Sequence, residues 1–318
     1  GPNKDINYII ALVVGMAIPT IIIVILFLLN NNITGPKDIE FLSKIPILGV
    51  IGKSSSILTV FEKSKSPVSE SFRAMRSGLD FIFRKQKNNP DAKTILVTSS
   101  VSGEGKTFTS INMASLYAIA GKKTVLVGLD LRKPKIFGDF NLHNNFGVVN
   151  YLIADKKLSE VTQHTHVPNL DLITAGPIPP NPSELIISEE MDQFIAELKE
   201  KYDYVVLDTP PLGLVTDALD LTRFSDANLY MIRQDYTKKG MLGLINEKYE
   251  NKEIKNLSFV LNYFKQKTGY GYGYGYGYGY GYGYGYGYGV YGNGYHELEN
   301  ETSILSKIKN VIKTRVRK

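Results

Sequence analysis

The chain has 318 residues, 43% of them hydrophobic and 21% charged, so it is long and apolar enough for one α/β domain of about 200 residues with appendages. It contains no cysteine, which excludes disulfides and thiolate metal sites, and its four histidines lack the spacing of a metal site. The net charge of +6 resides in positions 307–318, which hold six basic residues and no acidic one, so the remainder lacks the basic excess typical of nucleic-acid binding.

The first predicted element is a transmembrane helix within residues 1–35. Residues 8–29 carry no charge over 22 positions, and at about 1.5 Å per residue they can cross a hydrocarbon core of about 30 Å. A cleaved signal peptide is the competing interpretation, but the stretch is too long and Asn30–Asn32 would make a poor cleavage site. Pro19 should kink the helix without abolishing it. The lysines from Lys37 to Lys65 outnumber Lys4, which favours a cytoplasmic carboxyl side.

The main domain is expected at residues 67–265, after a connector at 36–66 that holds a helix near 38–43 and an extended segment at 45–49. The domain opens with a helix at 67–83, where Phe72, Met75 and Leu79 have helical spacing. Short apolar runs separated by helix-length segments then indicate buried strands at 94–98, 124–129, 170–174, 204–207, 227–232 and 258–261. This alternation predicts an α/β fold in which helices sandwich a parallel sheet, similar to the P-loop NTPases.

A phosphate-binding loop is expected at residues 100–107, Ser-Val-Ser-Gly-Glu-Gly-Lys-Thr, between the first strand and a helix that begins near Thr107. Gly103 and Gly105 let backbone N–H groups approach the phosphates of a nucleotide. Lys106 can reach the β and γ oxygens, and Thr107 can bind Mg²⁺. Ser100 replaces the first glycine of the usual pattern, a departure that other positions must offset.

Two aspartates at strand ends complete the expected site. Asp208 ends the strand at 204–207, where its carboxylate can hold Mg²⁺, and Asp130 follows the strand at 124–129. A capping or ion-paired aspartate is the alternative at each position. Because the carboxyl ends of parallel strands share one crevice, Lys106, Asp130 and Asp208 are expected to converge there as the catalytic group.

A cluster of glycine and tyrosine occupies residues 266–296, with ten unbroken Gly-Tyr pairs at 269–288. Glycine at every second position disfavours a stable strand, so a flexible, disordered tail is predicted. Composition alone leaves open a row of phosphate acceptors or an adhesive segment, and the nucleotide site favours acceptors. The candidate acceptors are Tyr270, Tyr272, Tyr274, Tyr276, Tyr278, Tyr280, Tyr282, Tyr284, Tyr286, Tyr288, Tyr291 and Tyr295. Residues 297–318 form a basic amphipathic tail that either lies on a membrane or is a solvated helix.

Together these motifs resemble the bacterial tyrosine kinases of capsule and exopolysaccharide export, the BY-kinases. The resemblance covers residues 36–295 and rests on the phosphate loop, residues 130–134 (Asp-Leu-Arg-Lys-Pro), the proline-rich loop 175–185, residues 207–211 (Leu-Asp-Thr-Pro-Pro) and the tyrosine-rich tail, in that family's order. The apolar amino-terminal helix is similar to the second membrane span of the polysaccharide co-polymerase, which is fused to the kinase in some members.

The resemblance implies a protein-tyrosine autokinase that uses ATP and Mg²⁺. The matching positions imply nucleotide binding by Ser102, Gly103, Glu104, Gly105, Lys106 and Thr107, and Mg²⁺ binding by Thr107, Asp130 and Asp208. Gly128 departs from the family's Asp-x-Asp pattern, so Asp130 is left to fill the role that two carboxylates usually share. Asn262 could contact adenine, as an equivalent asparagine does in related ATPases, or could form a turn.

The resemblance also implies an assembly. Glu70, Arg73 and Arg76 match the Glu-x-x-Arg-x-x-Arg helix through which subunits of the family meet in a ring, expected here as an octamer, although a solvated helix remains the alternative. The implied location is the bacterial inner membrane, with the kinase domain and tail in the cytoplasm. The implied partners are the polysaccharide polymerisation and export machinery and a protein-tyrosine phosphatase, but no nucleic acid.

Two other functions stay open at this point. One is an ATP-binding assembly scaffold with little kinase activity, which Ser100 and Gly128 favour. The other is an ATPase similar to ParA and MinD, which is disfavoured because Val101 stands where those proteins carry their signature lysine.

Overall fold

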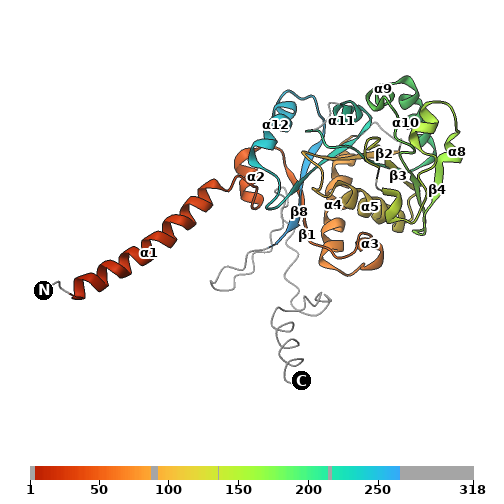
Figure 1. The fold of residues 1–318 in the computed structure, drawn as a ribbon. Helices are drawn as coiled ribbons and strands as arrows, with labels where there is room; N and C mark the ends of the chain where they lie inside the picture. The colour runs from red at the N-terminus through yellow and green to blue at the C-terminus, as the bar shows by residue number, and fades with distance from the viewer. Residues whose placement is uncertain (1–3, 87–91, 135, 214–216, 266–318) are drawn as a thin grey trace, which may run out of the picture.

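An eight-stranded sheet forms the centre of the molecule, as the arrangement of the ribbon in Figure 1 illustrates. The computed structural model describes residues 4–86, 92–134, 136–213 and 217–265. The strands lie in the order β1-β8-β7-β2-β6-β3-β5-β4, and among them only the β4–β5 pair is antiparallel. The strand bounds are β1 Ile47–Gly52, β2 Lys93–Ser99, β3 Thr124–Gly128, β4 Thr162–His164, β5 Leu170–Ile173, β6 Tyr204–Asp208, β7 Ala227–Arg233 and β8 Leu257–Phe264. Each of the six predicted strands overlaps one of these, and the predicted α/β fold class is confirmed.

Helices cover both faces of the sheet. The helix bounds in the described residues are α1 Lys4–Leu29, α2 Pro36–Leu42, α3 Thr59–Glu62, α4 Pro67–Lys85, α5 Lys106–Ile119, α6 Ile136–Asp139, α7 Val148–Leu152, α8 Leu158–Val161, α9 Pro182–Ile186, α10 Glu189–Lys201, α11 Asp217–Asp220 and α12 Leu242–Glu250, with 3₁₀ turns η1 Leu221–Phe224 and η2 Lys239–Met241. One face packs on α3, α4 and α5, and the other packs on α7, α8 and α10 and, over β7 and β8, on α2 and α12.

Alternating side chains of the central strands fill these two cores. In β7, Leu229 and Met231 pack toward α4 and α5, whereas Tyr230 and Ile232 pack toward α2 and α12. Because both faces are covered, the strands are apolar along their whole length, which is why the sequence shows them as continuous hydrophobic runs. The parallel pairing places the carboxyl ends of β2, β3 and β6 at one edge of the sheet.

The predicted connector at residues 36–66 is part of the folded domain. Its extended segment forms β1, which pairs in parallel with β8, and Ile39 of α2 and Ile45 are buried against β7, β8 and α12. Packing therefore places no boundary at residue 67. The sequence does not indicate this because β1 pairs with a strand about 200 residues away in the chain, and the local residues show only an extended segment.

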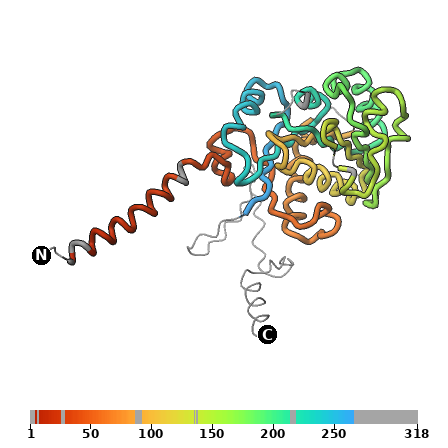
Figure 2. Tube along the Cα trace, in the orientation of Figure 1, coloured from red at the N-terminus to blue at the C-terminus, as the bar shows by residue number. Residues whose placement is uncertain are grey.

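Helix α1 extends away from the body of the molecule, as the trace in Figure 2 shows. Residues Tyr8–Ile25 have a mean hydropathy of 2.7 and are not buried by the rest of the chain, so the helix is long and apolar enough to cross a membrane. Pro19 lies inside the continuous helix. The predicted tyrosine cluster and basic tail fall outside the described residues.

Candidate nucleotide-binding site

The predicted phosphate loop connects β2 to α5. Its glycines Gly103 and Gly105 have φ angles of 88° and 102°, in the left-handed region that costs other residues about 1–2 kcal/mol. Gly105 is the N-cap of α5 and supplies no side-chain cap. The first N–H groups of any α-helix lack intrahelical acceptors, and here no N-cap side chain engages them, which is the arrangement that binds phosphate oxygens.

Asn262 supports this loop from behind. Its Nδ2 donates a hydrogen bond to the carbonyl oxygen of Glu104 at 3.0 Å, and its Oδ1 accepts one from the N–H of Tyr263 at 2.8 Å. A Cβ atom on residue 105 would lie 1.9 Å from this Nδ2, so any other residue there would displace the Asn262 amide. Backbone groups engage both ends of the amide, and Asn262 does not line the cavity. Its contact with adenine stays a prediction.

Glu104 braces the inside of the loop. Its carboxylate is fully buried and accepts hydrogen bonds from the N–H of Val101 at 3.0 Å and from the hydroxyl of Thr237. Burial raises the pKa of this carboxyl, although the bonds from Thr237 and Val101 oppose the shift. The side chain of Glu104 is engaged within the loop, and the nucleotide contact expected of Glu104 from the sequence stays a prediction.

Lys106, Thr107 and Asp208 meet where α5 begins and β6 ends. Thr107 Oγ1 donates to Asp208 Oδ2 at 2.8 Å, and Ser110 Oγ donates to Asp208 Oδ1 at 3.2 Å. The Lys106 Nζ donates to Ser99 Oγ at 3.1 Å. Burial raises the pKa of Asp208 to about 6, although the Thr107 hydroxyl and the Lys106 charge work against this shift. A hydroxyl and a carboxylate at this point form the kind of oxygen pair that holds Mg²⁺ beside a nucleotide.

Asp130 lies across the same cavity. It follows β3, its carboxylate is half-buried, and its Oδ1 accepts a hydrogen bond from the N–H of Lys133 at 3.0 Å. Its negative charge contributes to the raised pKa of Asp208. Asp130 is thus held by the turn that the next residues make, with its second oxygen available to a ligand in the cavity.

Gly128 pairs directly with Asp208 in the β3–β6 register. A Cβ atom on residue 128 would approach Ile136 Cγ2 to 3.2 Å and the Ala175 nitrogen to 3.5 Å. These contacts are tight but would require only a small movement of Ile136. Residue 128 therefore presents no side chain beside Asp208, at a position where a Cβ atom would fit after a small adjustment of Ile136.

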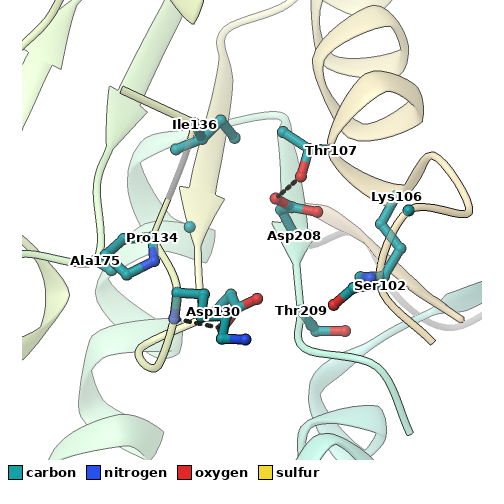
Figure 3. Close-up of a pocket in the computed structure, with 12 residues that line it drawn as sticks. Ser102, Lys106, Thr107, Asp130, Pro134, Ile136, Ala175, Asp208 and Thr209 are labelled. Carbon is teal, nitrogen blue, oxygen red and sulfur yellow. Dashed lines mark hydrogen bonds between the residues drawn. The ribbon is translucent and has the colours of Figure 1, made fainter. Parts of the chain in front are cut away.

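Figure 3 shows the cavity that these side chains share. It is lined by Ser102, Gly103, Lys106, Thr107, Gly128, Asp130, Lys133, Pro134, Ile136, Ala175, Asp208 and Thr209. The structure thus brings together the predicted Ser102, Gly103, Lys106, Thr107, Asp130 and Asp208. Within the described residues no group of three or more carboxylate, histidine or cysteine side chains could hold a metal by itself. Mg²⁺ would fit here as it does in other nucleotide sites, held by few protein oxygens together with phosphates.

A segment that the sequence motifs do not indicate holds the outer side of the loop. Arg233 donates to the carbonyl oxygen of Gly103 at 2.8 Å, and the Tyr236 hydroxyl donates to that of Ser102 at 3.0 Å. The Arg233 guanidinium lies 4.8 Å from the ring centre of Tyr236 and 4.1 Å from that of Tyr263. With Thr237, these residues fix three consecutive loop positions. No motif carries this signal, because the contacts reach backbone atoms that only the fold brings close.

The departure at Ser100 has a local explanation. Its hydroxyl lies 2.9 Å from the hydroxyl of Tyr230, and both are buried. Ser100 is not among the residues with a positive φ, so this position of the loop does not require glycine. Tyr230 supplies the partner that a buried serine needs.

The predicted interface residues lie away from the cavity, on the surface of α4. Arg73 forms an ion pair with Glu70 and donates to the carbonyl oxygen of Ser64 at 2.7 Å. Arg73 and Arg76 also line a shallow groove with the partly exposed Phe61 and Ile119. The internal pair fits a solvated helix, and the groove fits a contact with another chain, so the interface stays a prediction.

Known proteins resemble this chain over the region that holds the site. A family model described as an AAA domain matches residues 92–259. The chain is 44% identical over 168 residues to the putative tyrosine-protein kinase CapB of Staphylococcus aureus. This alignment covers 52% of this chain and 72% of CapB. It is 34% identical over 198 residues to the tyrosine-protein kinase YwqD of Bacillus subtilis (strain 168), in an alignment that covers 62% of this chain and 82% of YwqD. The solved structure of the chimerical protein CapA2B2 aligns with a TM-score of 0.67 and 37% identity, over 73% of this chain and 100% of that one.

Proposed function

The chain belongs to the bacterial tyrosine-protein kinases, and we propose that it transfers the γ-phosphate of ATP to tyrosines of its own carboxyl-terminal cluster. The observation that carries this proposal is the convergence of a phosphate loop and two strand-end carboxylates on one cavity. The same chain holds a row of phenol hydroxyls at residues 270–295. Enzyme and acceptor are therefore supplied by one sequence.

Each cavity residue would have a distinct role in the transfer. The α5 N-terminus and Lys106 would hold the β and γ phosphate oxygens, and Thr107 and Asp208 would hold Mg²⁺, which when bound neutralises phosphate charge. Asp130 would orient the tyrosine hydroxyl and accept its proton as the phenol oxygen bonds to phosphorus and the bond to ADP breaks. Positioning and charge compensation supply most of the catalysis in such reactions.

The position of Gly128 makes Asp130 the carboxylate on which this proton transfer would rest. Asp208 is engaged by the hydroxyls of Thr107 and Ser110, which suits a metal ligand better than a base. Asp130 accepts one backbone hydrogen bond through Oδ1 and faces the cavity. The alternative of an assembly scaffold with little kinase activity is favoured by the same glycine, since loss of one carboxylate could slow the transfer.

We further propose that the transfer occurs between neighbouring subunits of a ring, with an octamer as the expected size. The exposed groove beside Arg73 and Arg76, with Phe61 and Ile119 at its edge, supports a contact between copies. Each added phosphate brings a charge of about −1.5 to −2 at neutral pH, so a phosphorylated cluster would repel its neighbours and favour dissociation of the ring.

The proposed setting is the cytoplasmic side of a bacterial inner membrane. The apolar side chains of α1 from Tyr8 to Ile25 are exposed, as expected for a helix covered by lipid. By resemblance, cycles of phosphorylation by this kinase and removal by a protein-tyrosine phosphatase would regulate the machinery that polymerises and exports a polysaccharide.

A mixing experiment tests the transfer and its direction. One protein would carry Lys106→Ala with its tyrosines intact, and the other would keep Lys106 but have the cluster tyrosines replaced by phenylalanine. Incubation with ATP and Mg²⁺ should place phosphotyrosine on the Lys106→Ala protein. If the unmodified chain becomes phosphorylated but the Lys106→Ala protein in this mixture does not, the transfer occurs within one chain. If the unmodified chain binds ATP and gains no phosphotyrosine, the scaffold alternative holds.

A further inference from the structure

Helix α2 exposes an apolar side chain between positive charges. Phe41 is 89% exposed, the largest exposed fraction among the large apolar side chains of the described residues. Lys37 is also exposed and precedes Phe41 by about one helical turn, so both lie opposite the fully buried Ile39. Lys44 is exposed just after the helix, and Glu40 adds one negative charge at the side.

The segment between α1 and α2 is fixed to the folded domain. Ile33 is fully buried, its N–H donates to the carbonyl oxygen of Thr237 at 2.8 Å, and its own carbonyl accepts from Asp235 at 2.8 Å. The N–H of Lys239 donates to the carbonyl oxygen of Asn31 at 2.8 Å. The end of α1 is therefore tied to the body of the molecule instead of being joined by a loose linker.

Asp38 fixes the orientation of α2 in the same way. Its Oδ2 accepts hydrogen bonds from the backbone N–H and the hydroxyl of Thr34, both at 2.8 Å, and its Oδ1 lies 3.1 Å from Lys239 Nζ. Burial alone would raise the pKa of this carboxyl, but the Thr34 bonds and the Lys239 charge outweigh it and hold the pKa below its usual value. The face with Lys37 and Phe41 is thus held in one direction.

The short tether limits how far α2 can lie from a membrane. Leu29 ends α1 and Ile33 is already buried in the domain, so four residues span at most about 14 Å between them. Figure 1 shows α2 next to the end of α1, between that helix and the sheet. Of the elements of the folded domain, α2 follows the span most closely in the chain.

We propose that the face of α2 formed by Lys37, Phe41 and Lys44 docks on the anionic lipid surface of the membrane that α1 spans. Phenylalanine suits the boundary between headgroups and acyl chains, and lysines are attracted to anionic headgroups. Lys238 is exposed on the loop that pairs with Asn32, so it adds a further positive charge near the end of the span. This inference rests on the membrane anchor of the proposed function. Docking would hold the kinase domain in a fixed orientation on the bilayer.

The absence of tryptophan from the chain allows a direct test. A Phe41→Trp variant of the full chain carries a single fluorescent probe on this face. The matched control is Ile153→Trp, because Ile153 is 57% exposed and is the C-cap of α7. Helix α7 packs on β3 and β5, toward the other end of the sheet from β7 and β8, on which α2 packs. Both proteins would be reconstituted in vesicles of phosphatidylcholine alone or with phosphatidylglycerol, and flotation of the vesicles would first establish anchoring.

In anionic vesicles the Phe41→Trp probe should show a blue-shifted emission, loss of quenching by acrylamide and gain of quenching by brominated lipid, whereas the Ile153→Trp probe should show none of these changes. Adding Lys37→Glu and Lys44→Glu should reverse the changes while the protein still floats.

A floating protein whose two probes are equally open to acrylamide would overturn the docking face and leave the anchor intact. Protein that does not float would overturn the anchor itself. Protection that appears in detergent and grows with protein concentration would overturn lipid as the occupant and indicate a second copy.

Discussion

Replacing Gly105 by alanine should damage the phosphate loop in two separable ways. The φ of 102° costs an alanine about 1–2 kcal/mol, and its Cβ would lie 1.9 Å from Asn262 Nδ2. Asn262 must then move and lose its hydrogen bond to Glu104, which adds about 1 kcal/mol. We expect Gly105→Ala to lower the free energy of unfolding by about 2–3 kcal/mol and to weaken nucleotide binding strongly.

Gly121 provides the matched control at the other end of α5. Its φ is 83°, but an added Cβ would meet no atom within 4 Å, so Gly121→Ala should cost only the backbone part, about 1–2 kcal/mol, and leave nucleotide affinity unchanged. Adding Asn262→Ala to Gly105→Ala removes the steric part, so the two changes together should cost about 1 kcal/mol less than the sum of each alone.

The assays are urea unfolding of the detergent-solubilised chain and calorimetric titration with a non-hydrolysable ATP analogue. The reasoning fails if Gly105→Ala and Gly121→Ala are equally destabilising and bind the analogue equally. It also fails if the double variant shows no coupling between positions 105 and 262, since the clash would then not be the cause.

Three further changes test other parts of the site. Thr237→Val keeps the buried shape but removes the hydroxyl donor to the Glu104 carboxylate. It should lower the free energy of unfolding in urea by about 1–3 kcal/mol and weaken binding of the ATP analogue in calorimetry. Unchanged values would show that Thr237 does not position the loop. Gly128→Asp restores a second carboxylate beside the cavity and should raise the rate of phosphotyrosine formation in a timed assay, whereas a fall would mean that the fold cannot accept the side chain. Arg76→Ala should reduce the particle size in sedimentation velocity, while Arg84→Ala in the last turn of the same helix should not; equal sizes for both would argue against the α4 interface.

Elements whose signal is local can be predicted from the sequence of this chain. The six buried strands are continuous apolar runs, and the phosphate loop is a contiguous motif between a strand and a helix, so the residues themselves locate both. Strand β1 reads as a connector in the sequence because it acquires its partner, β8, only in the folded chain. Strand β4 has three residues and a partly exposed surface, which leaves no periodic pattern to detect.

The same distinction separates the predicted site residues from those that sequence reasoning misses. Lys106, Thr107, Asp130 and Asp208 can be placed at the cavity from the sequence because each belongs to a contiguous motif. The support from Arg233, Tyr236 and Thr237 cannot, because these side chains bind carbonyl oxygens and a carboxylate at least 130 positions away in the chain. Asn262 illustrates the middle case, since the sequence predicts its proximity to the nucleotide site but not its bond to Glu104.

The central claim is that this chain phosphorylates its own tyrosine cluster, and the intact mass of the purified protein after incubation with ATP and Mg²⁺ tests it most directly. The account predicts a ladder of phosphate additions that is absent from the Lys106→Ala variant and from a variant with phenylalanine at the twelve candidate tyrosines. An unmodified mass in protein that demonstrably binds ATP, or a ladder that persists in the phenylalanine variant, would contradict it.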